Sequence, residues 1–162
     1  MTERVDVNVT VNGDPRSLVI EPNETIADVL RDRLGLVGTK ISCDAQVCGA
    51  CAVLVDDLAV SACTYLAVDA DGASVRTVEG LAIDGKLSAL QQAFIEGAAF
   101  QCGFCTPGML MAATALLEED PDPSREAVIE GLEGNLCRCT GYEPIVDAVL
   151  AAAKVGQARG AA

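Results

Sequence analysis

Three cysteines stand close together in residues 41–51, where the sequence reads ISCDAQVCGAC. Cys43, Cys48 and Cys51 follow the order C-x4-C-x2-C, and Cys63 comes after a further eleven residues. This is the spacing with which plant-type proteins bind a [2Fe–2S] cluster through cysteine thiolates. A loop this short turns three sulfurs onto one core only if its backbone wraps tightly, which Gly49 permits. The stretch therefore predicts a cluster site that still needs a fourth ligand.

A short hairpin after this loop is predicted to supply that ligand. Residues 52–55 and 59–62 are apolar runs typical of strands, and residues 56–58 between them form a turn with Asp57 at its centre. A chain that turns here and runs back returns Cys63 to the side of Cys51. We therefore predict that these two cysteines complete the first site together with Cys43 and Cys48.

Composition narrows the class of protein. The chain has 162 residues, of which 51% are hydrophobic, and this is enough for one domain or two small ones. Residues 1–10 lack the apolar core of a signal peptide, and no apolar run approaches the roughly 18 residues of a membrane span. We therefore expect a cytoplasmic protein whose eight cysteines stay reduced, which disfavours a disulfide framework. The net charge of −13 disfavours nucleic acid and anionic membranes as partners.

The first half of the sequence is predicted to be rich in strands. Valines alternate with polar residues over residues 5–11, Asn12-Gly13 is a strong hairpin signal, and residues 17–20 form the returning strand. Thr25 and Asp28 can cap a helix that ends at Gly35. Residues 73–78 are predicted to form the last strand. This order of elements predicts a β-grasp ferredoxin-like domain over residues 1–78.

The second half is predicted to be helical. Residues 79–86 form a connecting segment, and helical patterns then fill residues 87–155. Ser88 begins a helix that lasts to about residue 98, Thr106 one to about residue 118, Ser124 one to residue 131, and Glu143 one to about residue 154. The prediction is an α+β chain whose second domain is a four-helix bundle. Residues 156–162 are predicted to form a flexible tail.

A second set of cysteines lies in the helical half. Cys102 and Cys105 have the spacing C-x2-C, Cys137 and Cys139 the spacing C-x1-C, and both pairs precede predicted helix N-termini. Such ends carry unpaired N–H groups and partial positive charge, which would stabilise an anionic thiolate-bound cluster. Four thiols also suit a structural zinc site, but the x1 spacing is unusual for zinc fingers. The neighbouring plant-type set favours a second [2Fe–2S] cluster.

Both cysteine sets lie in runs that resemble one known family. QCGFCTPGM at residues 101–109 and GNLCRCTGY at residues 134–142 are similar to the signature of the iron-sulfur subunit of molybdenum hydroxylases, the xanthine oxidase family. CGAC at residues 48–51 and SACTYLAV at residues 61–68 agree with it. The resemblance extends over residues 5–153. It is nearest to the small subunits of aerobic carbon monoxide dehydrogenases and of bacterial N-heterocycle hydroxylases.

The resemblance implies an electron-transfer subunit of an oxidoreductase, in which this chain is not itself catalytic. Substrate is expected to be oxidised at molybdopterin-bound molybdenum on a large partner subunit. Electrons are then expected to pass through the helical-half cluster and the N-terminal cluster to FAD on a medium subunit, in a dimer of heterotrimers. In the family, the glutamine before the first cysteine of the second set contacts the pterin, and Gln101 fills that position. The expected ligands are Cys102, Cys105, Cys137 and Cys139 near molybdopterin, and Cys43, Cys48, Cys51 and Cys63 near FAD.

Three residues depart from the family pattern. Ser42 and Gln46 stand where many relatives have glycine, and Asp57 replaces a usual turn glycine, although aspartate tolerates a positive φ better than most residues.

Two other functions compete with the electron-transfer subunit. A free-standing two-cluster ferredoxin is the first alternative, and a zinc-binding interaction module is the second. The family signature around the second cysteine set favours the electron-transfer subunit over both.

Overall fold

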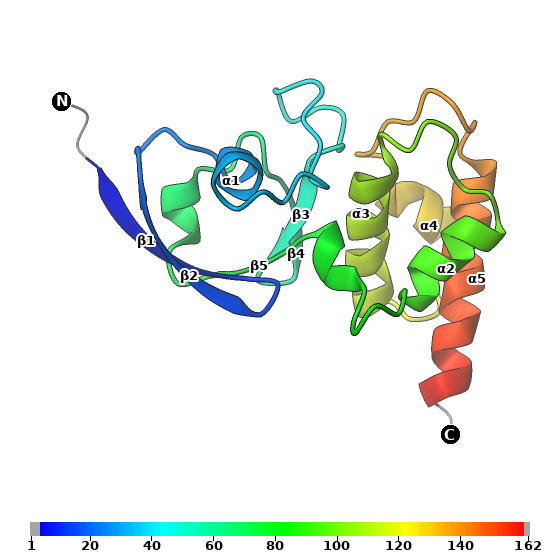
Figure 1. Cartoon of the computed structure of the whole chain (residues 1–162). Helices are drawn as coiled ribbons and strands as arrows, with labels where there is room; N and C mark the ends of the chain where they lie inside the picture. The colour runs from blue at the N-terminus through cyan, green and yellow to red at the C-terminus, as the bar shows by residue number, and fades with distance from the viewer. Residues whose placement is uncertain (1–3, 161–162) are drawn as a thin grey trace.

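The computed structural model of the chain describes residues 4–160 as a sheet-rich half and a helical half that lie side by side (Figure 1). The sheet runs in the order β2-β1-β5-β3-β4. Strand β1 is parallel to β5, and the remaining neighbouring pairs are antiparallel. The strands are β1 (Val5–Val11), β2 (Asp14–Ile20), β3 (Ala52–Val55), β4 (Leu58–Ser61) and β5 (Ser74–Arg76).

The first hairpin forms as its sequence predicts. Val7, Val9 and Val11 of β1 are buried while the neighbouring Asp6 and Asn8 are exposed. The turn between the two strands contains Asn12 and Gly13, both with positive φ. Strand β2 begins earlier than predicted, at Asp14, because it lies at the edge of the sheet, where the proline at position 15 removes no ladder bond that an inner strand would need.

One short helix covers the sheet. Thr25 and Asp28 form the predicted capping box at the start of α1 (Ile26–Asp28), which continues as the π-helical segment η1 (Val29–Arg33). The turn ends at Gly35, which has a φ of 70°. Two 3-10 turns, η2 (Ala67–Ala70) and η3 (Val78–Leu81), flank β5, so this strand is shorter than the predicted 73–78. The core between helix and sheet includes Ile20, Ile26, Leu30, Val53 and Val75.

Four helices follow in the second half, namely α2 (Ala89–Glu96), α3 (Thr106–Glu119), α4 (Arg125–Gly131) and α5 (Glu143–Gly160). Ser88 and Gln91 make the predicted capping box on α2, and Ser124 caps α4. Their shared core includes Phe94, Met109, Val128, Ile145 and Val149. No helix within residues 4–160 is both long and apolar enough to cross a membrane.

Helix α5 is longer than predicted. The sequence suggested an end near residue 154 and a flexible tail over residues 156–162, but α5 continues to Gly160. Alanine is the strongest helix former and no proline interrupts this stretch, so the single glycine at position 156 is too weak a signal to end the helix. Residues 161 and 162 of the predicted tail lie outside the described residues.

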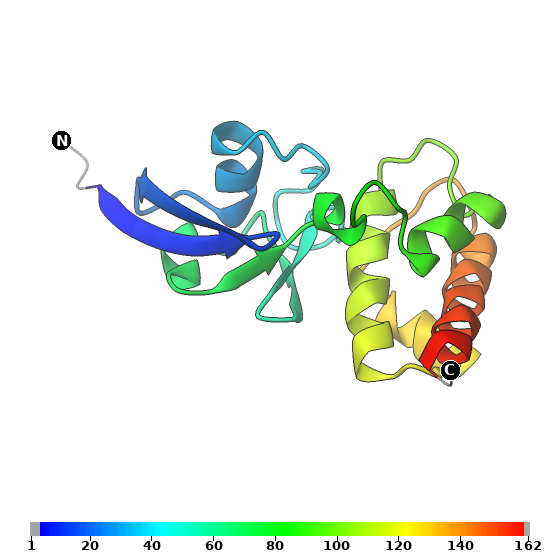
Figure 2. The same ribbon diagram turned by 60° about the horizontal axis from the view of Figure 1, so that its bottom comes forward.

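Helix α3 joins the two halves. Among helices α2 to α5, both views show it nearest the sheet (Figure 1, Figure 2), and it packs against β3. All four residues of β3 are buried, because one face of the strand lies in the sheet core while Ala52 and Leu54 pack against Met111 of α3. A strand that is apolar on both faces therefore holds the two halves together.

Candidate metal centres

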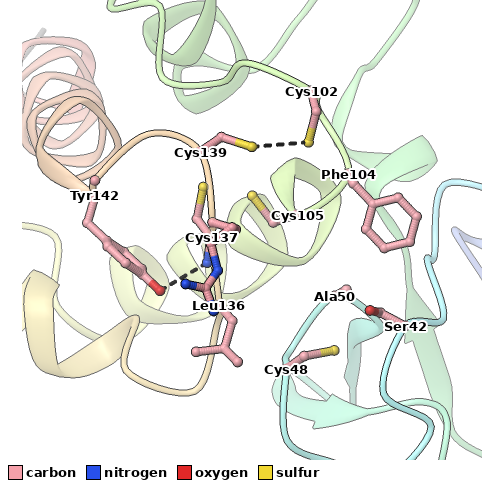
Figure 3. Close-up of a pocket in the computed structure, with 12 residues that line it drawn as sticks. Ser42, Cys48, Ala50, Cys102, Phe104, Cys105, Leu136, Cys137, Cys139 and Tyr142 are labelled. Atoms are coloured by element: carbon pink, nitrogen blue, oxygen red, sulfur yellow. Dashed lines mark hydrogen bonds between the residues drawn. The ribbon is translucent and has the colours of Figure 1, made fainter.

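The four cysteines of the second set come together between two loops. Cys102 and Cys105 lie in the loop that leads into α3, and Cys137 and Cys139 lie in the loop between α4 and α5. Figure 3 shows the four sulfurs turned toward one another, with the sulfurs of Cys102 and Cys139 3.6 Å apart. Gln101 donates a hydrogen bond from Nε2 to the carbonyl of Cys139 at 3.0 Å, which ties the two loops together.

The inner pair of this set is Cys105 and Cys137. Cys105 is the N-cap residue of α3. Burial, followed by the neighbouring Cys137 thiol, raises the pKa of Cys105 to about 12. Burial opposes ionisation of Cys137 too, but hydrogen bonds from the hydroxyl and N–H of Thr140 outweigh it and lower the pKa of Cys137 to about 7. Cys102 and Cys139 form the exposed outer pair.

The first set also divides into two pairs. Cys51 and Cys63 are buried in the sheet core, where burial, with Cys63 alongside, raises the pKa of Cys51 to about 11. Cys43 is half-buried, and N–H groups of Val47, residue 45 and Cys48 lower its pKa to about 6. The N–H of Val47 lies 3.4 Å from the Cys43 sulfur. Cys43 and Cys48 therefore form the second pair.

The backbone of the first loop is wrapped as tightly as its spacing predicts. Three of its residues, Asp44, Gln46 and Gly49, have φ between 52° and 67°, in the left-handed region. Only glycine adopts this conformation freely. Gln46 nevertheless adopts it, so the loop closes without a glycine at that position. The predicted turn at Asp56 and Asp57 is likewise left-handed at both residues, and β3 pairs with β4 across it.

This pairing of thiols is the arrangement that a [2Fe–2S] cluster requires, because each of its two irons takes two protein ligands. Among residues 4–160, no three Cys, Asp or Glu side chains are placed to hold one metal ion. Thr106, directly after Cys105, also has a buried hydroxyl with no hydrogen-bond partner in the described structure. The paired thiols fit a sulfur-rich group at the second set.

One cavity connects the two sets. It has a volume of about 610 Å³ and is lined by Cys48 of the first set and by Cys102, Cys105, Cys137 and Cys139 of the second. The loops that carry them are bonded to each other. The N–H of Leu136 donates to the carbonyl of Cys48 at 2.9 Å, and Nδ2 of buried Asn135 donates to the carbonyl of Gly49 at 2.9 Å.

Sequence reasoning missed both Asn135 and Leu136. They stand directly before Cys137, but nothing in the spacing of GNLC indicates a partner 86 residues away. The feature that marks this contact is the burial of Asn135 in a loop. The sequence does not reveal it, because nothing in a polar residue next to a glycine indicates that its side chain is buried. The structure thus adds a direct contact between the two cysteine loops to the predicted sites.

Comparison with known proteins assigns one domain to each set. A model described as a 2Fe-2S iron-sulfur cluster binding domain matches residues 9–81, and one described as a [2Fe-2S] binding domain matches residues 77–150. The first range contains Cys43, Cys48, Cys51 and Cys63, and the second contains Cys102, Cys105, Cys137 and Cys139. The chain therefore has two 2Fe-2S binding domains.

Similar proteins match nearly the whole chain. The nicotine 6-hydroxylase small subunit of Paenarthrobacter nicotinovorans is 52% identical over 98% of this chain and 96% of its own length. The nicotinate dehydrogenase small FeS subunit of Eubacterium barkeri is 47% identical over 90% of this chain and 93% of its own. A chain in the crystal structure of quinoline 2-oxidoreductase from Pseudomonas putida 86 is 48% identical, with a TM-score of 0.92 over 96% of this chain and 97% of its own.

A longer chain contains the same fold as a part. The aldehyde oxidoreductase of Desulfovibrio gigas aligns with a TM-score of 0.92 and 42% identity over 96% of this chain but only 17% of its own. The arrangement described above therefore occurs both as a separate chain and as a segment of a larger one.

Proposed function

We propose a function from the premise that this chain belongs to the small iron-sulfur subunits of the molybdenum hydroxylases of the xanthine oxidase family. It acts as the electron-transfer subunit, which takes electrons from a molybdopterin site on a large partner subunit and delivers them to FAD on a medium partner subunit. When bound, two [2Fe–2S] clusters supply the one-electron carriers. The cavity carries this proposal, because Cys48 of the first set lines it together with all four cysteines of the second set.

The division of labour within the chain follows from its two cores. A β-grasp domain over residues 1–78 holds one cluster with Cys43, Cys48, Cys51 and Cys63. A connecting segment over residues 79–86 leads to a four-helix bundle over residues 87–155, which holds the other with Cys102, Cys105, Cys137 and Cys139. The sheet order, with β1 parallel to β5 beneath one helix, supports the first assignment. The separate apolar core of α2 to α5 supports the second.

Exposure supports the direction of transfer. Cys102 and Cys139 are the exposed cysteines of the chain, so this edge of the helical domain faces the molybdopterin-binding subunit. Gln101 lies at the same edge, where its amide keeps a second N–H and its oxygen for the pterin after it has bonded to Cys139. The cluster of the sheet domain then faces the FAD-binding subunit.

The proposed assembly is a dimer of heterotrimers in the cytoplasm. The two exposed outer cysteines offer a face on which a partner chain can approach the second cluster, which supports a complex over a free-standing ferredoxin. A reducing compartment supports cluster assembly, because it keeps thiols available as iron ligands. The pairing of the thiols two by two supports clusters over the zinc alternative, in which four thiolates converge on one ion.

The test uses the complex purified together with its partner chains under anaerobic conditions. After reduction with dithionite, electron paramagnetic resonance (EPR) should resolve two different [2Fe–2S] signals. Cys105→Ser should remove one signal and slow reduction of FAD by substrate, while Cys43→Ser, the reciprocal control, should remove the other. A complex that contains zinc in place of iron at the second set would contradict the proposal. So would loss of both signals from either variant while the fold is intact.

A further inference from the structure

A closed group of hydrogen bonds surrounds Cys137. The backbone N–H of Cys137 donates to the hydroxyl of Tyr142 at 2.9 Å (Figure 3). The N–H of Tyr142 donates to Oγ1 of Thr140 at 3.2 Å. Oγ1 of Thr140 in turn lies 3.1 Å from the sulfur of Cys137, and the N–H of Thr140 lies 3.5 Å from the same sulfur. Three residues of one loop are therefore bonded in a ring around one sulfur.

Either atom could be the donor while Cys137 is a thiol, but the direction of the bond between Thr140 and Cys137 is fixed once Cys137 binds iron as a thiolate. A threonine hydroxyl has one proton to donate, and its oxygen here already accepts the N–H of Tyr142. A thiolate that binds iron has lost its proton and can only accept. The Thr140 hydroxyl therefore donates to the Cys137 sulfur.

The loop holds Thr140 in this position at a cost. Tyr142 has a φ of 69°, which is uncommon and strained for a bulky residue. This conformation directs the N–H of Tyr142 back at Thr140, while the ring packs against the helical core. Strain of this kind persists where the surroundings enforce it, and it concentrates at functional sites.

We propose that Thr140 is a positioning residue that raises the reduction potential of the cluster bound by Cys102, Cys105, Cys137 and Cys139, by donating its hydroxyl proton to the sulfur of Cys137. The inference rests on the proposed function, because it requires Cys137 to be a cluster ligand. One electron received from the molybdenum site adds one negative charge, which the thiolate sulfurs share. A donor at the sulfur stabilises the more negative, reduced state more strongly than the oxidised state.

The effect is confined to one cluster. Within residues 4–160, Thr140 is the residue whose hydroxyl bonds to a cysteine sulfur; the corresponding bond to Cys43 comes from the backbone N–H of Val47. A substitution at Thr140 therefore leaves the donors of the first set unchanged. The EPR signal of the sheet-domain cluster serves as the control within the same sample.

The experiment is a redox titration of the purified complex, followed by EPR, for the unsubstituted chain, Thr140→Val and Thr140→Ser. Valine has the shape of threonine without the hydroxyl, and serine keeps the hydroxyl. We expect valine to shift the reduced-to-oxidised ratio of one cluster about tenfold toward the oxidised state, which is about 59 mV for one electron. Serine should restore the ratio to within about twofold, and the other signal should not move.

Three results would overturn the inference. If valine leaves the ratio unchanged, or if valine and serine shift it equally, the hydroxyl has no role in the potential. If the Thr140→Val variant does not insert the cluster, Thr140→Ala takes its place in the comparison with Thr140→Ser. If the alanine variant also lacks the EPR signal of this cluster, the hydroxyl serves to retain the cluster and not to set its potential. The proposed function fails separately, when the unsubstituted complex lacks one of the two [2Fe–2S] signals.

Discussion

Gly108→Ala tests the contact that joins the two cysteine loops. Gly108 is the third residue of α3, where alanine is favoured over glycine by at most about 1 kcal/mol, so helix propensity alone predicts a more stable protein. A Cβ at this position, however, would lie well inside 3.0 Å of the Gly49 carbonyl oxygen and 3.1 Å from the Cα of residue 50. These are backbone atoms, which cannot turn aside as a flexible side chain does.

The cost of this clash exceeds the gain in propensity. An ordinary C···O contact is about 3.3 Å, so the loop that carries Cys48 must retreat by roughly 1 Å. Overpacking of this size costs about 1–3 kcal/mol. A retreat of that size also breaks the 2.9 Å bond from Asn135 to the Gly49 carbonyl, and a buried carbonyl left without a donor costs about 1–3 kcal/mol. We expect a net loss of about 1–5 kcal/mol, a large part of the stability of a typical domain.

The assay is anaerobic urea unfolding of the iron-loaded chain, followed by cluster absorbance and circular dichroism. Gly134→Ala is the matched control, because Gly134 lies in the facing loop, its φ is not positive, and a Cβ there meets nothing within 4 Å. The control should unfold within about 0.5 kcal/mol of the unsubstituted chain. If Gly108→Ala is as stable as that chain, or gains the 1 kcal/mol expected from propensity, the close approach of α3 to the first loop is refuted.

Three further predictions concern polar contacts. Asn135→Ala should lower the free energy of unfolding by about 1–3 kcal/mol in the same urea assay, because the carbonyl of Gly49 loses its buried donor. Ser88→Ala should lower it by about 1 kcal/mol through loss of the α2 capping box, and an unchanged urea midpoint would contradict this. The hydrogen bond from Arg76 lowers the pKa of Glu118, so this pair stabilises the folded state above the ordinary glutamate range and loses that contribution as the pH falls. Glu118→Gln should therefore show a smaller fall in thermal stability between about pH 5 and pH 3 than the unsubstituted chain, and parallel curves would contradict it.

The local elements could be predicted because their signals are local. Alternation over β1, the Asn12-Gly13 turn and the capping boxes at Thr25 and Ser88 each involve residues within seven consecutive positions, and the structure confirms all of them. The grouping of the cysteines into two sets of four could also be predicted, because spacing limits which sulfurs one loop can bring together. The identity of the iron ligands and the role of Gln101 stay predictions.

Other features could not be predicted because they depend on neighbours that are distant in sequence. Strand β2 extends back to Asp14 only because it lies at the sheet edge, and η1 adopts π-helical bonds that no apolar period distinguishes from an α-helix. Helix α5 continues past residue 154 because no proline follows and the glycine at position 156 is too weak a signal to end it. The bond between Asn135 and Gly49 crosses from one half of the chain to the other, and each residue is ordinary in its own loop.

The contact between the halves explains why glycine stands where helix propensity favours alanine. Each cysteine loop is anchored in its own core, the first through Cys51 and the second through Tyr142. The separation of the two sets therefore depends on how closely the loops meet. Gly49 and Gly108 let backbone meet backbone there, since a Cβ at either position would collide with a carbonyl oxygen. The approach brings Cys48 into the wall of the cavity of the second set. In a family that passes single electrons from one cluster to the next, this contact shortens the distance between the two cluster sites. Side chains at positions 49 and 108 would lengthen it.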